Sequence, residues 1–142
     1  AALLHDLGKV GIPSDILQKP EPLSEDEWML MRRHPEIGAQ IVQTVTGLNG
    51  VATIIQCHHE HFDGSGYPHG LKGYQIPLGS RILAVVDAFE AITGGRIYRP
   101  ARSAEAALDE IQRCAGTQFD PQIVEAFVAL IHEEGFNANQ GE

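Results

Sequence analysis

Apolar residues recur every three or four positions over most of this chain, the spacing that lines one face of an α-helix. The spacing predicts helices over 1–8, 24–33, 51–60, 79–93, 103–114 and 121–135, and another from Pro35 to a turn at Asn49-Gly50. Residues 10–23 and 61–78 are predicted to be irregular, because proline and glycine interrupt them. No stretch alternates convincingly between apolar and polar residues, although a small hairpin within 67–78 stays open. The pattern therefore predicts an all-α fold.

Capping residues mark where several of these helices begin. Ser24 is followed three residues later by Glu27, which is the pattern of a capping box. Pro35 suits a first helical position, while Ser103 and Asp120 are expected to cap the last two helices. Five apolar residues are expected on the inward face of the 79–93 helix: Ile82, Val85, Val86, Phe89 and Ile92.

Length and charge narrow the class of protein. The chain has 142 residues, 43% of them hydrophobic, which is enough for one compact domain with a buried core. A formal net charge of −9 argues against a broad nucleic-acid-binding surface, so no DNA partner is expected. A phosphate ligand stays compatible with this charge if metal ions or a few arginines concentrate positive charge locally.

The sequence shows no mark of secretion or of a membrane span. No segment of it resembles a signal peptide, and its longest apolar runs are too short to cross a bilayer, so no direct membrane insertion is expected. The two cysteines lack CxxC spacing and are expected to be reduced, as in a cytoplasmic protein. Ala1-Ala2-Leu3-Leu4 has the composition of a helix interior without an N-cap, which predicts a piece of a longer chain.

Two adjacent histidines, His58 and His59, are predicted at the end of the 51–60 helix, just before the glycine-rich loop. Neighbouring helical residues point about 100° apart, so the two imidazoles suit two ions about 3.5–4 Å apart better than one ion. Val51, Ile54 and Ile55 mark the inward face of this helix, and His58 continues that face. A solvated helix end is the alternative, and this inward face makes it the weaker one.

His5 and Asp6 form a second adjacent pair within an apolar segment. A carboxylate bridges two ions through its two oxygens, and an imidazole binds one of them. Lys9, one turn further on, points to the same place if the helical turn persists. For this motif alone, a metal site and a surface helix end with a local His–Asp hydrogen bond are equally open.

Asp87 and His34 are two further candidate ligands. Asp87 lies mid-helix among apolar residues, where a buried carboxylate needs a partner or a metal ion. The alternative interpretation is that Asp87 lies on the polar edge of the helix, solvated together with Glu90. His34 by itself is more often structural, but imidazole and carboxylate groups together suit manganese, iron or zinc.

Two arginines and three histidines complete the candidates. Arg96 and Arg99 lie three apart beyond the 79–93 helix, and guanidinium groups bind phosphate through a fork of donors. A solvated turn is the alternative for this pair. The remaining histidines are expected at the surface: His61, His69 and His132. Of these three, His61 is the most readily included in a metal site, because it lies three residues after His58.

These motifs occur together and in order. His5-Asp6-Leu7-Gly8-Lys9 matches an HDxGK motif, and the stretch from His58 to Pro68 matches HHExxDGxGYP at eight fixed positions. Both motifs resemble the HD-GYP family, a branch of the HD-domain metal phosphohydrolases. Further landmarks of that family follow in the expected order: Arg33-His34-Pro35-Glu36-Ile37-Gly38, Ile76-Pro77, Asp87-Ala88-Phe89 and Arg96-Ile97-Tyr98-Arg99.

The resemblance implies an HD-domain helical bundle with a long glycine-rich (GYP) loop. It implies hydrolysis of cyclic di-GMP to pGpG or GMP in bacterial second-messenger signalling, with two or three divalent metal ions, iron or manganese foremost. Six residues match the family's metal ligands: His5, Asp6, His34, His58, His59 and Asp87. The catalytic positions match Asp6 and Lys9. The substrate-binding positions match Lys9, Asp63, Gly66, Tyr67, Arg96 and Arg99.

The resemblance also implies a domain organisation and partners. Residues 1–136 are interpreted as an HD-GYP domain that lacks its N-terminal helix or helices and the family ligands on them, and 137–142 as a polar tail. A sensor or receiver domain in the same parent chain is expected, with diguanylate cyclase domains as further candidate partners. Glu90 and Ile97 stand where the family usually has aspartate and proline.

Two alternatives to cyclic di-GMP hydrolysis stay open. One is a catalytically incomplete module that binds a cyclic dinucleotide or docks a partner, against which the retained His-His and His-Asp pairs argue. The other is a phosphodiesterase for a different cyclic dinucleotide, such as cyclic GMP-AMP. The sequence does not distinguish between the two bases.

Overall fold

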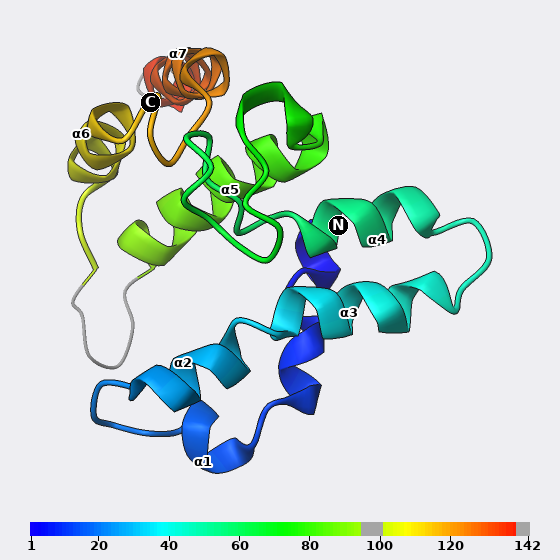
Figure 1. Cartoon of the computed structure of the whole chain (residues 1–142). Coiled ribbons are helices and arrows are strands. Elements are labelled where there is room, and N and C mark those ends of the chain that lie inside the picture. Colours follow the sequence, from blue (N-terminus) through cyan, green and yellow to red (C-terminus); the bar gives the residue numbers. More distant parts are fainter. Residues whose placement is uncertain (95–100, 139–142) are drawn as a thin grey trace.

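A computed structural model describes residues 1–94 and 101–138, and helices dominate these two ranges (Figure 1). The α-helices are α1 Ser14–Leu17, α2 Glu25–Met31, α3 His34–Gln43, α4 Asn49–Gln56, α5 Leu78–Thr93, α6 Ala104–Arg113 and α7 Pro121–Ala138. Three short 3-10 helices accompany them: η1 Ala2–Leu4, η2 Leu7–Gly11 and η3 Gly73–Gln75. The predicted all-α fold is confirmed, since an isolated bridge between Ala115 and Phe119 is the β-type pairing found in the two ranges. No helix among them is both long and apolar enough to cross a membrane.

Local capping places the helix starts where the sequence predicts them. The Ser24 hydroxyl accepts a hydrogen bond from the Glu27 backbone N–H, and the Glu27 carboxylate accepts one from the Ser24 N–H, which completes the capping box. Ser103 accepts from the Ala106 N–H at the start of α6, and Asp120 accepts from the Gln122 N–H at the start of α7. These bonds satisfy N–H groups that a helix leaves without partners in its first turn.

Several predicted boundaries are wrong. Residues 1–8 form two 3-10 helices instead of one α-helix, because Asp6 takes φ −93° and ψ 2° between them. The segment predicted as irregular over 10–23 contains α1, and α2 ends at Met31, two residues before the predicted end. The hairpin left open within 67–78 does not form, since that segment contains η3 instead. Gly135 does not end α7, which continues to Ala138.

The end of α4 has the largest consequence for function. The helix begins at Asn49, two residues before the prediction, and ends at Gln56, because Cys57 takes φ −106° and ψ 10°. His58 and His59 therefore follow the helix in a turn, and the 100° spacing of helical neighbours does not describe them. His58 is nevertheless buried, with 2% of its surface exposed, as the continued inward face predicts.

The interior has two apolar centres. Ala39, Val42, Ala52 and Ile55 form one between α3 and α4, and Val85, Ile111, Phe119 and Val124 form the other among α5, α6 and α7. Of the inward face predicted for α5, Val85 and Ile92 are buried, and Phe89 packs against the second centre. Ile82 and Val86 are 43% and 38% exposed, so their prediction is wrong. The buried face instead includes Ser80, whose hydroxyl donates to the Ile54 carbonyl of α4 and turns this side of α5 inward.

The N-terminal segment lies across the start of α3 (Figure 1). This contact needs glycine at position 8, since a Cβ there would lie 1.8 Å from the His34 carbonyl oxygen. The close approach brings the His5-Asp6 turn next to His34, although almost thirty residues separate them in the sequence.

Candidate metal centre

Four segments of the chain bring six predicted ligands together: His5, Asp6, His34, His58, His59 and Asp87. His5 Nε2 lies 3.3 Å from an Asp87 carboxylate oxygen and 3.7 Å from an Asp6 oxygen. His34 Nε2 lies 3.6 Å from the other Asp6 oxygen. The His58 and His59 rings are 4.0 Å apart between centroids, and both approach the His34 ring.

The six groups form two overlapping sets of possible ligand atoms. His34, His58 and His59 offer atoms that all lie within 4.8 Å of one another, and so do His5, Asp6 and His58. His58 belongs to both sets. Asp6 reaches towards both as well, because its two oxygens face different histidines. Each set could hold a metal ion, and the two sets share His58 as a ligand.

Backbone hydrogen bonds orient three of the imidazoles in the same way. The Nδ1 atoms of His5, His34 and His58 lie 2.6, 2.8 and 2.6 Å from the carbonyl oxygens of Ala2, Met31 and Ile55, three residues earlier in each case. A carbonyl oxygen only accepts, so each Nδ1 carries a proton, which leaves Nε2 as the ring atom whose lone pair can bind a cation. Metal-binding histidines are commonly held in this manner.

Two of these lone pairs are buried without a hydrogen-bond partner in the part of the chain that the structure describes. They belong to Nε2 of His34 and of His58. A buried polar atom without a partner costs about 1–3 kcal/mol, so such atoms are few in folded proteins. A cation would satisfy both at once, and the donor set of imidazoles and carboxylates suits a transition metal.

The protonation states also suit metal binding. Burial lowers the pKa of His58 to about 4 and that of His59 to about 2, and it lowers the pKa of His34 as well. These three imidazoles are therefore neutral near pH 7, as a ligand must be. Burial alone would raise the pKa of Asp6, but the hydrogen bond and charge of Lys9 outweigh it and hold that pKa below its usual value.

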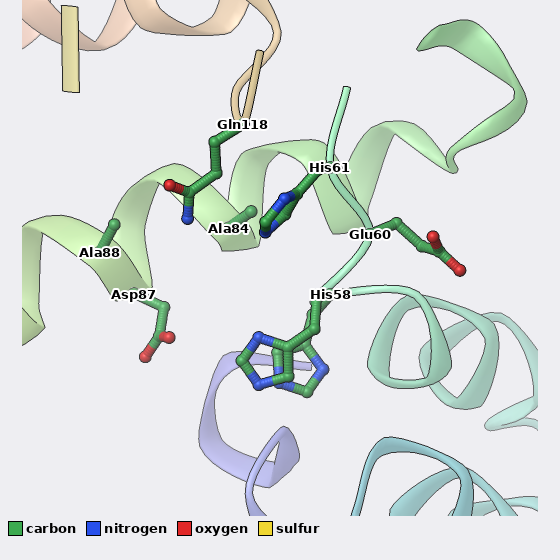
Figure 2. Close-up of a pocket in the computed structure, with 8 residues that line it drawn as sticks. His58, Glu60, His61, Ala84, Asp87, Ala88 and Gln118 are labelled. Atoms are coloured by element: carbon green, nitrogen blue, oxygen red, sulfur yellow. The ribbon is translucent and has the colours of Figure 1, made fainter. Parts of the chain in front are cut away.

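Lys9 lies where the sequence predicts, beside the centre. Its ammonium group is 2.6 Å from an Asp6 oxygen, in a pair that is only half-buried. Asp87 also faces the centre, as Figure 2 shows, with 29% of its side chain exposed. Glu90, three residues further along α5, is exposed and belongs to the polar edge of that helix.

The glycine-rich loop covers one side of the centre through Tyr67. The Tyr67 ring stacks on the His59 ring, with 4.9 Å between centroids and 26° between planes. Burial raises the pKa of the Tyr67 hydroxyl to about 12, so it stays protonated and able to donate. Asp63 is exposed and accepts from the Ser65 N–H within the loop. Gly66 has no room for a side chain, since a Cβ would lie 2.2 Å from the His61 backbone nitrogen.

A cavity of about 130 Å³ opens beside the histidines (Figure 2). It is lined by His58, His59, Glu60, His61, Ala84, Asp87, Ala88 and Gln118. The surface position predicted for His61 is therefore wrong, because this half-buried ring forms part of the cavity wall. His69 and His132 are exposed, as predicted. Arg96, Ile97 and Arg99 lie outside the described residues.

Gln118 and Glu60 are site residues that the sequence analysis missed. Gln118 reaches the cavity from the turn between α6 and α7, almost 60 residues from His59, and no local pattern announces it. Glu60 is 2% exposed, and its carboxylate accepts hydrogen bonds from the backbone N–H groups of His69 and Leu71. It thus closes the glycine-rich loop onto the end of the histidine pair. An acid placed directly after two histidines was the available signal.

We expect Glu60→Ala to lower the free energy of unfolding by about 2–4 kcal/mol, because two backbone N–H groups lose a charged acceptor. Glu60→Gln keeps one acceptor oxygen and should cost less. Urea unfolding measures both, and hydrogen exchange at His69 and Leu71 locates the effect. Glu21→Ala, at an exposed position, is the control. Equal stability of Glu60→Ala and this control would contradict the assigned role.

Comparison with known proteins gives consistent matches. A family profile described as HD domain matches residues 1–123. A probable cyclic di-GMP phosphodiesterase of Vibrio cholerae is 43% identical over an alignment of 144 positions, which covers 96% of this chain and 32% of the relative. A 3'3'-cGAMP-specific phosphodiesterase of the same organism is 42% identical over 140 residues, covering 97% and 26%.

A solved structure agrees with these matches. The crystal structure of a cyclic GMP-AMP-specific phosphodiesterase of V. cholerae superposes with a TM-score of 0.71 at 25% identity, over 99% of this chain and 39% of that one. The chain spans about a third of the length of the curated relatives that it matches.

Proposed function

Because this chain belongs to the HD-GYP branch of the HD domain family, we propose that it hydrolyses the phosphodiester bonds of cyclic di-GMP to pGpG or GMP, with divalent metal ions as its cofactors. The observation that carries the proposal is the pair of buried, neutral imidazoles, His34 and His58, whose Nε2 atoms have no partner among the described residues. They lie beside the carboxylates of Asp6 and Asp87, and no side chain or backbone group within residues 1–94 and 101–138 satisfies them.

Six residues would hold the ions: His5, Asp6, His34, His58, His59 and Asp87. Two or three ions fit the two overlapping ligand sets, and iron or manganese suits a mixture of imidazole and carboxylate. Bound ions supply a Lewis acid that lowers the pKa of water and neutralises phosphate charge.

The protein's own side chains have separate roles in this proposal. Asp6 is placed between the two ligand sets and keeps them at a fixed spacing. Lys9 holds Asp6 ionised and adds a positive charge for a phosphate oxygen in the transition state. Tyr67 offers a neutral hydroxyl at the edge of the centre, and Asp63 and Gly66 shape the loop that presents it. Arg96 and Arg99 complete the proposed phosphate contacts.

Cyclic GMP-AMP is the second candidate substrate. Its support is the 42% identity to a relative described as specific for 3'3'-cGAMP, which nearly equals the 43% identity to the cyclic di-GMP relative. Rates with the two substrates, measured side by side, decide between them. A kcat/KM ratio that favours cyclic GMP-AMP would replace the first assignment without changing the reaction class.

Location and partners belong to the same proposal. Both cysteines are free thiols, and that suits a reducing compartment such as the bacterial cytoplasm. The matched region makes up about a third of these relatives. A sensor or receiver domain elsewhere in the same polypeptide is therefore a proposed partner. Diguanylate cyclase domains, which make the substrate, are a further proposed partner.

Removal of metal is the direct test of the proposed function. The purified protein should contain iron or manganese by elemental analysis and convert cyclic di-GMP to pGpG or GMP, separated by chromatography. Chelation should abolish this conversion, and Mn²⁺ or Fe²⁺ should restore it. A metal-loaded protein that binds the dinucleotide and leaves it intact would refute hydrolysis and support a binding module.

A further inference from the structure

Three flat side chains and a guanidinium group form a row of successive contacts that begins at the proposed ligand His59. The His59 ring stacks on Tyr67. The Arg32 guanidinium carbon lies 5.7 Å from the centroid of the Tyr67 ring and 6.0 Å from that of the Trp28 ring. Trp28 lies on α2, and Arg32 directly follows that helix, where its N–H donates to the Trp28 carbonyl. The row therefore joins α2 to the loop and to a proposed metal ligand.

Arg32 differs from the other cation at this centre in its electrostatic surroundings. Lys9 is already paired with Asp6, whereas no carboxylate in the described ranges lies within ion-pairing distance of Arg32. Arg32 is also exposed. In a protein with a net charge of −9, an exposed guanidinium group beside the centre and without an acidic partner there is well suited to bind an anion.

Trp28 is the single tryptophan of the chain, and its side chain is not used for the core. The residue is 43% exposed and belongs to neither apolar centre. Indole rings stack on nucleobases with little preference for the base, and each such contact strengthens binding by about 5- to 100-fold. A cation next to an exposed indole therefore suits a nucleotide, because the guanidinium group can bind the phosphate and the indole ring can stack on the base.

We propose that Arg32 and Trp28 form a second contact region for the cyclic dinucleotide, in which Arg32 binds the phosphate that is not being cleaved and Trp28 stacks on a purine. This inference rests on the proposed function. The Tyr67 ring links the two regions, because it stacks on His59 at 4.9 Å between centroids and has the Arg32 guanidinium carbon 5.7 Å from its centroid. Such contacts are equal in the ground state and the transition state, so they act on KM and leave kcat largely unchanged.

Arg32→Gln is the first test. It should raise KM for cyclic di-GMP by about 10- to 100-fold, the range for loss of one charged hydrogen-bond donor, with kcat within about threefold of the parent. Arg113→Gln makes the same change of net charge at an exposed position on α6 and should leave KM unchanged. An Arg32→Gln variant with the KM of the parent would overturn the phosphate contact.

The fluorescence of Trp28 gives a direct reading of the stacking contact, because no other tryptophan contributes. Adding cyclic di-GMP to the protein should change the emission with the same midpoint that equilibrium dialysis gives for binding. Trp28→Ala should weaken binding by about 5- to 100-fold, and Trp28→Phe, which keeps a flat ring, should retain most of the affinity. Binding seen by dialysis without any change in emission would overturn the stacking contact.

The two proposals fail in distinguishable ways. If Arg32→Gln and Trp28→Ala hydrolyse the dinucleotide as the parent does, the proposed second contact region is refuted and the proposed function is not affected. A parent protein that binds the dinucleotide without hydrolysing it, and whose affinity falls in both variants, supports the contact region and refutes the enzyme. A parent protein that neither binds nor hydrolyses the dinucleotide overturns both.

Discussion

Replacement of Asp6 by asparagine is expected to lower kcat/KM for cyclic di-GMP by about a thousand-fold or more, the largest effect that this site offers for one substitution. Asp6 reaches both ligand sets, with 3.7 Å to His5 and 3.6 Å to His34. Asparagine keeps the size of the side chain and removes the negative charge that neighbouring cations need. It also leaves the Lys9 ammonium group without its acidic partner, so a positive charge beside the proposed ion sites is no longer neutralised.

The expected loss has a second readout, which separates it from misfolding. Elemental analysis should show fewer metal ions per chain in Asp6→Asn, while circular dichroism should show the helical content of the parent. Asp109→Asn, at an exposed position on α6, makes the same charge change and should keep both metal and activity. Full metal content together with full activity in Asp6→Asn would remove Asp6 from the proposed machinery.

What the sequence predicts well is local. The capping box of Ser24 and Glu27 lies within four residues, and so does the Ser103 cap, so the chemistry that fixes these helix starts is visible in the sequence. Four of the six gathered ligands were also foreseeable as residue types, because His5-Asp6 and His58-His59 are adjacent pairs beside apolar segments and need a shared explanation. Their convergence depends on the close contact of Gly8 with His34, which the glycine alone did not reveal.

What the sequence does not predict depends on distant partners. On α5, Ser80 is buried and donates a hydrogen bond to the Ile54 carbonyl, while Ile82 and Val86 remain exposed despite their helical spacing. His58 and His59 lie together for a different reason from the one predicted, because α4 ends at Gln56 and a turn carries both rings. Gln118 enters the cavity wall from a turn almost 60 residues away.

The turn that carries Gln118 is held by an ion pair that was not foreseen. Arg81 of α5 pairs with Asp120, whose side chain is completely buried, and it also donates from Nε to the Ile76 carbonyl at the end of the loop. In the same turn, the carbonyls of Thr117 and Gln118 accept hydrogen bonds from the N–H groups of Asp63 and Phe62. Arg81 thus joins α5, the glycine-rich loop and the turn before α7.

Arg81→Gln should therefore lower the free energy of unfolding by about 3–5 kcal/mol, because it leaves the Asp120 carboxylate buried without its cation. For a chain of this size the melting temperature should fall by about 10–15 °C. Thermal unfolding followed by circular dichroism measures the change. The same variant should loosen the loop, so that amide hydrogen exchange becomes faster at Phe62 and Asp63, whose acceptors lie in the turn.

A matched pair on the surface tests whether burial causes this effect. Arg113 and Glu110 are also 2.5 Å apart, but the arginine side chain is 71% exposed, compared with 13% for Arg81. Water and salt screen such a pair, so Arg113→Gln should cost less than about 1 kcal/mol. Because the contact distance is the same, the difference between the two variants measures what burial adds together with the loss of the Arg81 Nε bond to the Ile76 carbonyl. Equal losses would mean that Asp120 is not stabilised through Arg81, and that other bonds hold the turn over the cavity.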